Sequence, residues 1–436
     1  MFSAIIVSQI MFFRQTGSQN LQHKMNTFGI VFLAAIALAT AMRLFLASRH
    51  LSHVRAHRDR VPDAFASEIG LAAHQKAADY TCAKTGFATI DMVVGVVVVL
   101  ALTFGGGLQW LHDVSAAWMA EGVLRGLLLI TLVGLLTTLV DLPLDLYRTF
   151  VIEQRFGFNK TTPGLFFTDL CKSLLVGVLL LLPLAALIIW LIRELGAYWW
   201  VYAWAVTVAY GIFVQFIAPT VIAPLFNKFS PMEDPELKAR VERLLERCEF
   251  KVKGLMKMDG SRRSAHGNAY FTGFGNSKRI VFFDTLLQQL NPAEVEAVLA
   301  HELGHFKLRH VLKRIALTSA LSLGFFWLLG FLMLQEWFFS SLGVVSPSPA
   351  MALVLFMFVL PPFTFLLQPL GALYSRKHEF EADQYASSHA SARDLVSALI
   401  KLYRDNAATL TPDPLHSAFY DSHPPAVARI ARLQKA

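Results

Sequence analysis

The sequence predicts a mainly α-helical, polytopic membrane protein with seven transmembrane helices and a cytoplasmic α+β domain. Hydrophobic residues make up 55% of its 436 positions and charged residues only 16%, whereas soluble domains carry about 25% charged residues. Seven stretches approach the roughly 20 apolar residues that cross a bilayer. The more polar remainder, about 150 residues, is long enough for a domain with its own core.

The seven apolar stretches lie at 27–47, 88–111, 122–142, 173–192, 198–219, 315–334 and 351–373. Pro361 and Pro362 should kink the last stretch, because proline removes a helical hydrogen bond. The opening run at 2–13 is shorter than a span and lacks the basic start and the cleavage site of a secretory signal. It is therefore not counted as a span.

Lysine and arginine are spread unevenly among the loops, and this asymmetry predicts the orientation. The 48–87 loop holds six and the tail after 373 holds eight, whereas the 335–350 loop holds none. The odd-numbered loops and the C-terminus should therefore be cytoplasmic, and the N-terminus should lie outside. We attribute the formal charge of +8 to these loops. The expected partner is the lipid bilayer, with no nucleic acid.

Four parts follow from this organisation. We expect an N-terminal membrane region (1–219), a cytoplasmic segment (220–312), spans six and seven (313–373) and a cytoplasmic tail (374–436). Periodicity and turn residues predict helices at 235–248 and 290–309, and short strands at 250–258, 268–274 and 279–283.

The helix at 290–309 contains the sequence HELGH, residues 301–305. His301 and His305 share one helical face, so both can donate an imidazole nitrogen to one Zn²⁺, and Glu302 can act on the metal-bound water. Gly304 should let another backbone or the substrate approach closely. If the helix ran on from His305 into the sixth span, the metal would lie roughly 15 Å outside that span.

A catalytic zinc needs a third protein ligand and an open position. The longer pattern with a third histidine six residues after HELGH fails, because position 311 is Val311. The better candidate is the segment SRKHEFEAD, residues 375–383. On a helix, Glu379 and Asp383 share a face, and Glu381 points about 200° away. Glu379 can then ligate one zinc per chain, while Asp383 orients a ligating histidine or donates a proton to the departing amine.

Taken together, seven segments resemble those of a known family, and they occur in the family's order. They are HQKAADYTCAK (74–84), VIEQRFGFNKTTP (151–163), APLFNKFSPM (223–232), GNAYFTGFGNSKRIVFFDTLL (267–287), HELGH (301–305), SRKHEFEAD (375–383) and HPPAVARI (423–430). The chain resembles the type I CAAX prenyl endopeptidases, which are integral-membrane zinc metalloproteases. The resemblance implies a ring of seven long helices around a water-filled chamber, closed on its cytoplasmic side by the zinc domain.

The resemblance also implies roles for individual residues. The zinc ligands match His301, His305 and Glu379, the general base matches Glu302, and the family's proton donor matches Asp383.

Further candidates lie outside the two metal segments. Asn268 and Tyr270 belong to a strand-like segment that can bind an extended peptide as an added strand. His423 can donate a hydrogen bond to the tetrahedral oxyanion. Arg429, in the same matching segment, is a further candidate for substrate binding.

The predicted activity is that of a zinc-dependent membrane endopeptidase. Two substrate classes stay open: prenylated C-terminal peptides, which the family's eukaryotic members cleave, and membrane proteins in quality control, the role attributed to bacterial relatives. The chain ends without a dilysine retrieval signal, which favours a bacterial inner membrane with the active site facing the cytoplasm. An alternative of another class is a transporter or channel with a regulatory zinc site, but it gives no reason for Glu302 between the two ligands.

Overall fold

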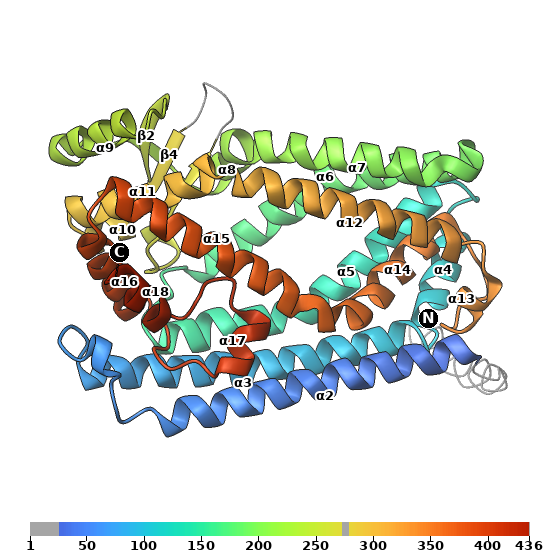
Figure 1. Ribbon diagram of the computed structural model, residues 1–436. Coiled ribbons are helices and arrows are strands. Elements are labelled where there is room, and N and C mark those ends of the chain that lie inside the picture. The colour runs from blue at the N-terminus through green and yellow to red at the C-terminus, as the bar shows by residue number, and fades with distance from the viewer. Residues whose placement is uncertain (1–25, 273–278, 436) are drawn as a thin grey trace.

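Long apolar helices and a small terminal domain make up the computed structural model, which describes residues 26–272 and 279–435. The helices run roughly side by side, and a small sheet with its covering helices lies at one end (Figure 1). The predicted opening run at 2–13 lies outside the described residues.

Within these residues, seven helices are long and apolar enough to cross a membrane. They are α2 (Thr27–Ala56), α3 (Leu71–Leu102), α5 (Val123–Tyr147) with a π-turn to Glu153, α6 (Pro163–Glu194), α7 (Trp199–Ile217) with its flanking turns, α12 (His310–Leu332), and α14 (Pro349–Thr364) continued by α15 (Gln368–His389). Several extend well beyond the predicted stretches. Hydropathy marks only the apolar part of a helix, whereas backbone hydrogen bonding carries the helix on into polar sequence.

The second span differs most from its predicted range of 88–111. Helix α3 ends at Leu102, and a separate helix, α4 (Gly107–Trp118), follows. The break falls at three consecutive glycines: Gly106 has φ +74°, and a Cβ on Gly105 would lie 2.5 Å from the carbonyl oxygen of Ala101. Only glycine adopts this tight turn without strain. The apolar sequence beyond the turn therefore belongs to another helix.

The seventh span is interrupted where its prolines predict a kink. A 3₁₀ turn, Phe365–Leu367, separates α14 from α15 directly after Pro361 and Pro362. Each proline removes one backbone donor and crowds the preceding turn. Helix α15 then continues beyond the apolar sequence and carries the segment SRKHEFEAD.

The spans bury few of their own side chains. Only 11% of the most apolar window of α3 is buried, and none of the corresponding window around α7. Helices packed into a solid bundle bury a stripe of at least 100°. Much of the apolar surface of these two helices is therefore left for lipid to cover.

The domain at the end of the helices is built on a four-stranded sheet. Its order is β1 (Phe229–Pro231), β2 (Gly254–Met258), β4 (Arg279–Phe283) and β3 (Ala269–Thr272), and β3 pairs antiparallel with β4. β2 to β4 correspond to the predicted strands, whereas β1, only three residues long, was not predicted. Helices α9 (Pro235–Arg247), α11 (Pro292–Lys307) and α16 (Ala392–Asp405) share a hydrophobic core with the sheet.

Helix α11 begins at a capping box. Asn291 accepts from the backbone N–H of Glu294, and the Glu294 carboxylate accepts from that of Asn291. From the sequence alone, a helix could run on from His305 into the sixth span, but α11 does not do so. It ends at Lys307, Arg309 adopts a left-handed conformation with φ +57°, and α12 starts anew at His310. This turn brings His310 back towards the end of α11.

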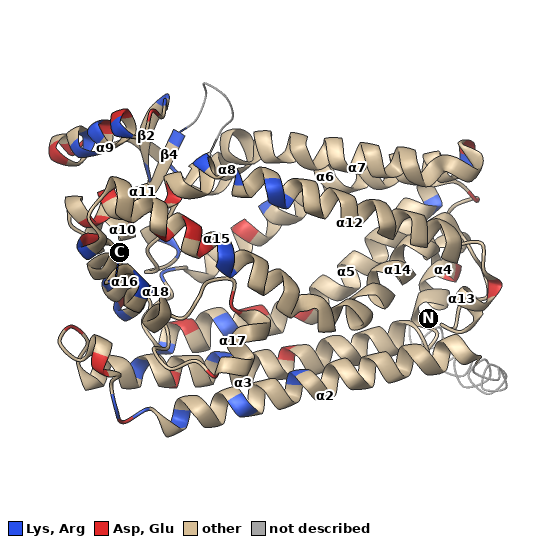
Figure 2. Ribbon diagram, viewed as in Figure 1, with Lys and Arg blue, Asp and Glu red and all other residues tan. Residues whose placement is uncertain are grey.

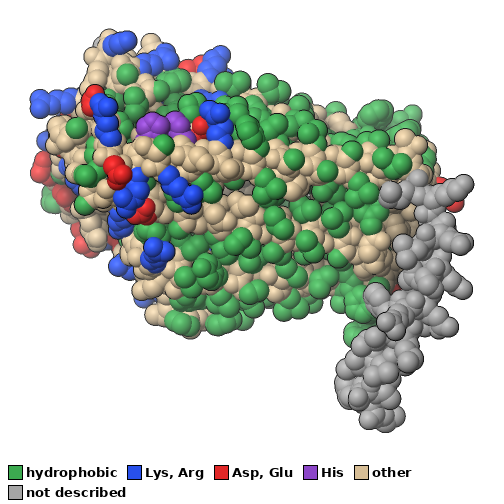
Figure 3. Space-filling model, turned by 90° about the horizontal axis from the view of Figure 1, so that it is seen from below, with side chains coloured by type: hydrophobic (Ala, Val, Ile, Leu, Met, Phe, Trp, Pro, Cys, Tyr) green, Lys and Arg blue, Asp and Glu red, His purple; other side chains and the backbone are tan. Residues whose placement is uncertain are grey.

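Charge is distributed along the long axis of the molecule. Lysine and arginine are concentrated at the end that carries α9, α11, α16 and α18 (Ala426–Leu433) (Figure 2). A broad band of hydrophobic side chains covers the helices beyond that end (Figure 3). Such a band is the surface that a bilayer requires.

Candidate metal centre

Two helices bring His301, His305 and Glu379 together. The histidines lie one turn apart on α11, and Glu379 faces them from α15. The Nε2 atoms of the histidines are 3.2 Å apart, and the Glu379 carboxylate oxygens are 3.5 Å from His301 Nε2 and 3.2 Å from His305 Nε2. All three side chains are largely buried.

These separations fit one tetrahedral cation. Zn–N and Zn–O bonds near 2.0–2.1 Å place neighbouring ligand atoms about 3.3–3.4 Å apart. The buried Oε2 of Glu379 makes no hydrogen bond among the described residues, and its charged neighbours there, His301 Nε2 and Arg429 Nη1, are each 3.5 Å away. A cation bound between the three side chains would give this oxygen a close partner.

Close packing of α11 on α15 makes the short distances possible. A Cβ on Gly304 would lie 3.0 Å from Ala382 Cα and 3.1 Å from Tyr385 Cβ. The glycine, between the two histidines, therefore lets the backbone of α15 approach, which is one of the two uses that the sequence suggested for it.

The second nitrogen of His301 is held by a carboxylate. His301 Nδ1 lies 2.9 Å from Asp383 Oδ1, and Asp383 is paired with Arg429, whose Nε and Nη2 donate to its two oxygens at 2.9 and 2.6 Å. Burial opposes protonation of His301, but the carboxylate of Asp383 at Nδ1 and that of Glu379 near Nε2 favour the charged ring, outweigh burial and raise the pKa of His301 to about 9. In the metal-free protein, this imidazole is therefore protonated on both nitrogens, and so positively charged, at neutral pH.

Arg429 occupies a different position from the one expected of a substrate-binding residue. Its side chain is only 6% exposed, and its Nη1 lies 3.5 Å from Glu379 Oε2. Pairing with two buried carboxylates leaves the guanidinium little surface for a peptide. Helix α18 thus supplies a counter-charge beneath the centre.

His305 has a partner that the sequence did not indicate. Its Nδ1 lies 3.0 Å from Nδ1 of His310, whose Nε2 lies 2.9 Å from Glu381 Oε2. Glu381 is off the face that carries Glu379, as helix geometry predicts, but it is not isolated. The contact between His305 and His310 depends on the left-handed turn at Arg309, which no sequence pattern indicated. In a continuous helix, His310 would lie away from His305.

His423 lies at the same centre, and Glu302 adjoins the centre in sequence. The side chain of Glu302, between the two histidines, is partly exposed and makes no hydrogen bond or ion pair among the described residues. His423 Nε2 lies 3.5 Å from Glu379 Oε1, and its side chain is 62% exposed. Both side chains are therefore at least partly open to solvent.

Asn268 and Tyr270 are not brought into this cluster. The Asn268 side chain accepts from the backbone N–H of Ala269, and the Tyr270 ring packs against Phe283. No hydrogen bond or ion pair links either residue to the three ligands in the described part of the chain. Strand β3, which carries Tyr270 and follows Asn268, has β4 on one side and no second strand among the described residues.

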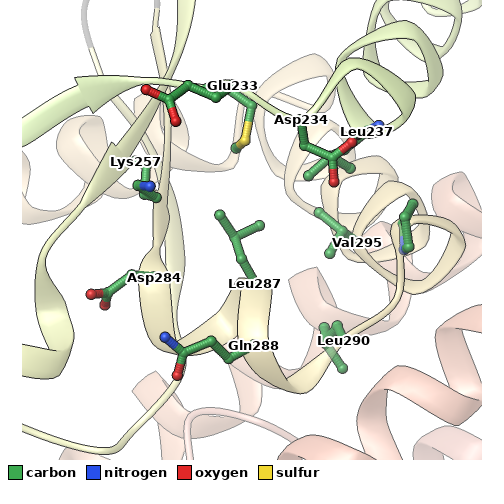
Figure 4. A pocket seen from close by; sticks show the side chains of 11 residues that line it. Glu233, Asp234, Leu237, Lys257, Asp284, Leu287, Gln288, Leu290 and Val295 are labelled. Carbon is green, nitrogen blue, oxygen red and sulfur yellow. Dashed lines mark hydrogen bonds between the residues drawn. The ribbon is translucent and has the colours of Figure 1, made fainter.

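A separate pocket of about 290 Å³ lies between α9, β2, α10 (Asp284–Gln289) and the start of α11 (Figure 4). Two of its three acidic groups already have structural partners: Asp234 caps α9, and Asp284 accepts from the backbone N–H of Ser261. None of the candidate metal ligands lines it, so it is not part of the centre.

Both halves of the chain match family models. Residues 50–228 match the family described as CAAX prenyl protease N-terminal, five membrane helices, and residues 231–436 match peptidase family M48.

Curated relatives and a solved structure match most of the chain. The CAAX prenyl protease 1 homolog of Arabidopsis thaliana is 36% identical over 383 residues, which cover 86% of this chain and 90% of that protein. The CAAX prenyl protease 1 of Saccharomyces cerevisiae is 35% identical over 331 residues, or 72% and 73% of the two chains. The crystal structure of S. mikatae Ste24p superposes with a TM-score of 0.88 at 29% identity, covering 94% of this chain and all of that one.

These relatives are eukaryotic. They support a multi-pass integral membrane protein, and they give no support to a bacterial inner membrane.

Proposed function

Because the chain belongs to the CAAX prenyl proteases of peptidase family M48, we propose that it removes C-terminal peptides from prenylated, membrane-associated substrates. It is a membrane-embedded metalloendopeptidase. The observation that carries the proposal is the cluster of His301, His305 and Glu379 in a chain with seven candidate membrane helices; Glu302 lies between the two histidines in sequence.

We propose one zinc ion per chain, held by His301 Nε2, His305 Nε2 and the Glu379 carboxylate. Bound zinc would polarise the scissile carbonyl and lower the pKa of a water molecule. Glu302 takes the proton from the attacking water and passes it to the leaving nitrogen.

Asp383 serves in this proposal as the residue that orients His301. Its bidentate pairing with Arg429 favours an ionised carboxylate, which accepts the Nδ1 proton of His301 and leaves Nε2 free for metal. The same pairing disfavours the alternative role of proton donor. Arg429 then acts through Asp383 and Glu379 and not on the substrate.

Substrate contacts are assigned to an edge strand and an exposed histidine. An extended peptide would add to the edge of β3 that pairs with no strand among the described residues, with Asn268 and Tyr270 contacting its backbone and side chains. His423 would donate a hydrogen bond to the developing oxyanion. Asn268→Ala should therefore mainly weaken substrate binding, and His423→Ala should mainly slow turnover.

The proposed orientation has the metal centre, the 220–312 segment and the tail after 373 in the cytoplasm. The gathering of lysine and arginine at that end supports it. The division at 219, 312 and 373 is kept as the proposed domain organisation.

A second candidate keeps the protease and changes its substrate to membrane proteins in quality control, with no need for an isoprenoid. The transporter alternative is not favoured, since residues 231–436, which hold the candidate metal centre, match a peptidase family.

The test compares two peptides with the same C-terminal sequence, one farnesylated on its cysteine and one unmodified, using the purified chain in lipid nanodiscs. We expect rapid cleavage of the farnesylated peptide only. Equal rates for both peptides would favour the quality-control alternative.

The catalytic assignment is tested with Glu302→Gln, which should lose cleavage but retain about one zinc per chain. Glu296→Gln is the matched control: it makes the same change on the same helix, where the carboxylate pairs with Arg247. Substantial cleavage by the purified Glu302 variant would overturn the proposed mechanism.

A further inference from the structure

A second group of titratable side chains adjoins the metal centre. His310, His378 and Glu381 offer ligand atoms within 4.8 Å of one another. His310 begins α12 and is fully buried, and the other two lie on α15. The group touches the first cluster through the contact between His310 and His305.

A second metal ion is one use for such a group, but the geometry disfavours it. The rings of His310 and His378 are stacked 3.9 Å apart with only 7° between their planes. Because the lone pair of an imidazole nitrogen lies in the ring plane, two stacked rings do not direct their lone pairs at one ion between them. Lys377 Nζ also lies 3.8 Å from Glu381 Oε1, and this positive charge opposes a cation.

The hydrogen-bond geometry points to another role. We propose that Glu381 and His310 form a relay that fixes the tautomer and orientation of His305, and so prepares it as a metal ligand. Both are positioning residues, and the inference rests on the proposed ligand set of His301, His305 and Glu379.

When each contact of the relay is given one donor and one acceptor, only one arrangement keeps both imidazoles neutral. The Glu381 carboxylate can only accept, so His310 must carry its proton on Nε2, 2.9 Å away. The Nδ1 of neutral His310 is then an acceptor, so His305 must carry its proton on Nδ1, 3.0 Å away. This leaves the lone pair of His305 Nε2 free, on the side that faces His301 and Glu379.

The opposite tautomer of His310 fails. With its proton on Nδ1, its Nε2 lone pair would face a carboxylate oxygen, and two acceptors would meet at 2.9 Å. His305 would then have to accept at Nδ1 and carry its proton on Nε2, where it blocks the metal.

The Nδ1 atom of each proposed histidine ligand is therefore connected to a carboxylate by hydrogen bonds. His301 reaches Asp383 directly, and His305 reaches Glu381 through one intervening imidazole. Such outer contacts orient a ligand and raise its basicity, and their loss typically costs roughly 10–100-fold in metal affinity or activity. Stacking against His378 holds the His310 ring in the plane that the relay needs.

The test measures zinc affinity by competition with a chromophoric chelator on the purified full chain. Glu381→Ala and His310→Phe should each bind zinc 10–100-fold more weakly, and a cooperative melting transition of each metal-free variant should show that it is still folded. Glu381→Gln should retain most of the affinity, because an amide oxygen accepts the same hydrogen bond. Lys377→Ala is the control: it removes the other contact of Glu381 and leaves the relay intact.

The outcomes separate the relay from the ligand set on which it rests. If His305→Ala binds zinc as the wild type does, the ligand set itself is wrong. If His305→Ala loses zinc but Glu381→Ala and His310→Phe bind it with wild-type affinity, the relay is wrong and the ligand set stands. Two zinc ions per wild-type chain, falling to one in Glu381→Ala, would overturn the relay in favour of a second metal site.

Discussion

Adding one methyl group at Gly304 should loosen the metal centre without unfolding the protein. A Cβ there would meet Ala382 Cα at 3.0 Å and Ala382 O at 3.2 Å, whereas non-bonded carbons prefer about 3.5–4.0 Å. Helices α11 and α15 must therefore separate by about 0.5 Å. His301 and His305 lie on one helix and Glu379 on the other, so the separation widens the gaps between the ligands.

Two free-energy terms of opposite sign decide how much zinc affinity Gly304→Ala loses. Overpacking costs about 1–3 kcal/mol, and alanine favours a helix over glycine by about 0.8–1.0 kcal/mol. In the metal-free protein the helices can move apart, so the two terms largely cancel. In the zinc-bound protein the ligands hold the helices together, and the full strain opposes binding. Since 1.4 kcal/mol is a factor of ten, we expect zinc to bind Gly304→Ala roughly 10–100-fold more weakly.

Competition with a chelator measures this loss, and melting of the metal-free protein measures stability. Gly371→Ala is the matched control, because Gly371 is a helical glycine of α15 at which an added Cβ would meet nothing within 4 Å. It should bind zinc with wild-type affinity. If Gly304→Ala binds zinc as tightly as this control, close packing of α11 on α15 does not set the ligand geometry.

The remaining predictions concern the ligands, pH and topology. Glu379→Ala should be purified largely zinc-free, whereas Asp383→Asn should keep zinc and turn over roughly 10–100-fold more slowly. Metal analysis and initial rates distinguish the two variants. A Glu379→Ala protein that retains its zinc would exclude Glu379 as a ligand. Zinc affinity of the metal-free protein should rise by up to tenfold per pH unit between pH 6 and 8, because a proton on His301, whose pKa is about 9, competes with zinc below that pKa; titrations that give the same affinity throughout this range would contradict it. In sealed membrane vesicles with the cytoplasmic face outward, a cysteine introduced in the 335–350 loop should react with a membrane-impermeant reagent only after permeabilisation, and labelling of the intact vesicles would reverse the topology.

Apolar runs and a short motif were enough to predict much of the fold. The spans depend on local hydropathy, and the metal ligands on residues one helical turn apart, such as His301 and His305. Sequence locates such features because their cause lies within a few neighbouring residues.

Features that depend on a single backbone conformation were missed. The left-handed turn at Arg309 and the glycine turn at Gly106 redirect the chain, although neither changes the hydropathy around it. The pairing of Arg429 with Asp383 and Glu379 was also hidden, because these partners lie far away in sequence. Side-chain partners brought together only by tertiary packing leave no periodic signal.

The path of the chain between the ligands has a consequence for biogenesis. His305 precedes span six and Glu379 follows span seven, yet the two side chains meet at the same end of the molecule. The chain must therefore cross the bilayer and return before the third ligand can reach the first two. A protein whose last hairpin has not been inserted would lack a complete centre. With the proposed ligand set, proteolytic competence would therefore depend on completed membrane insertion.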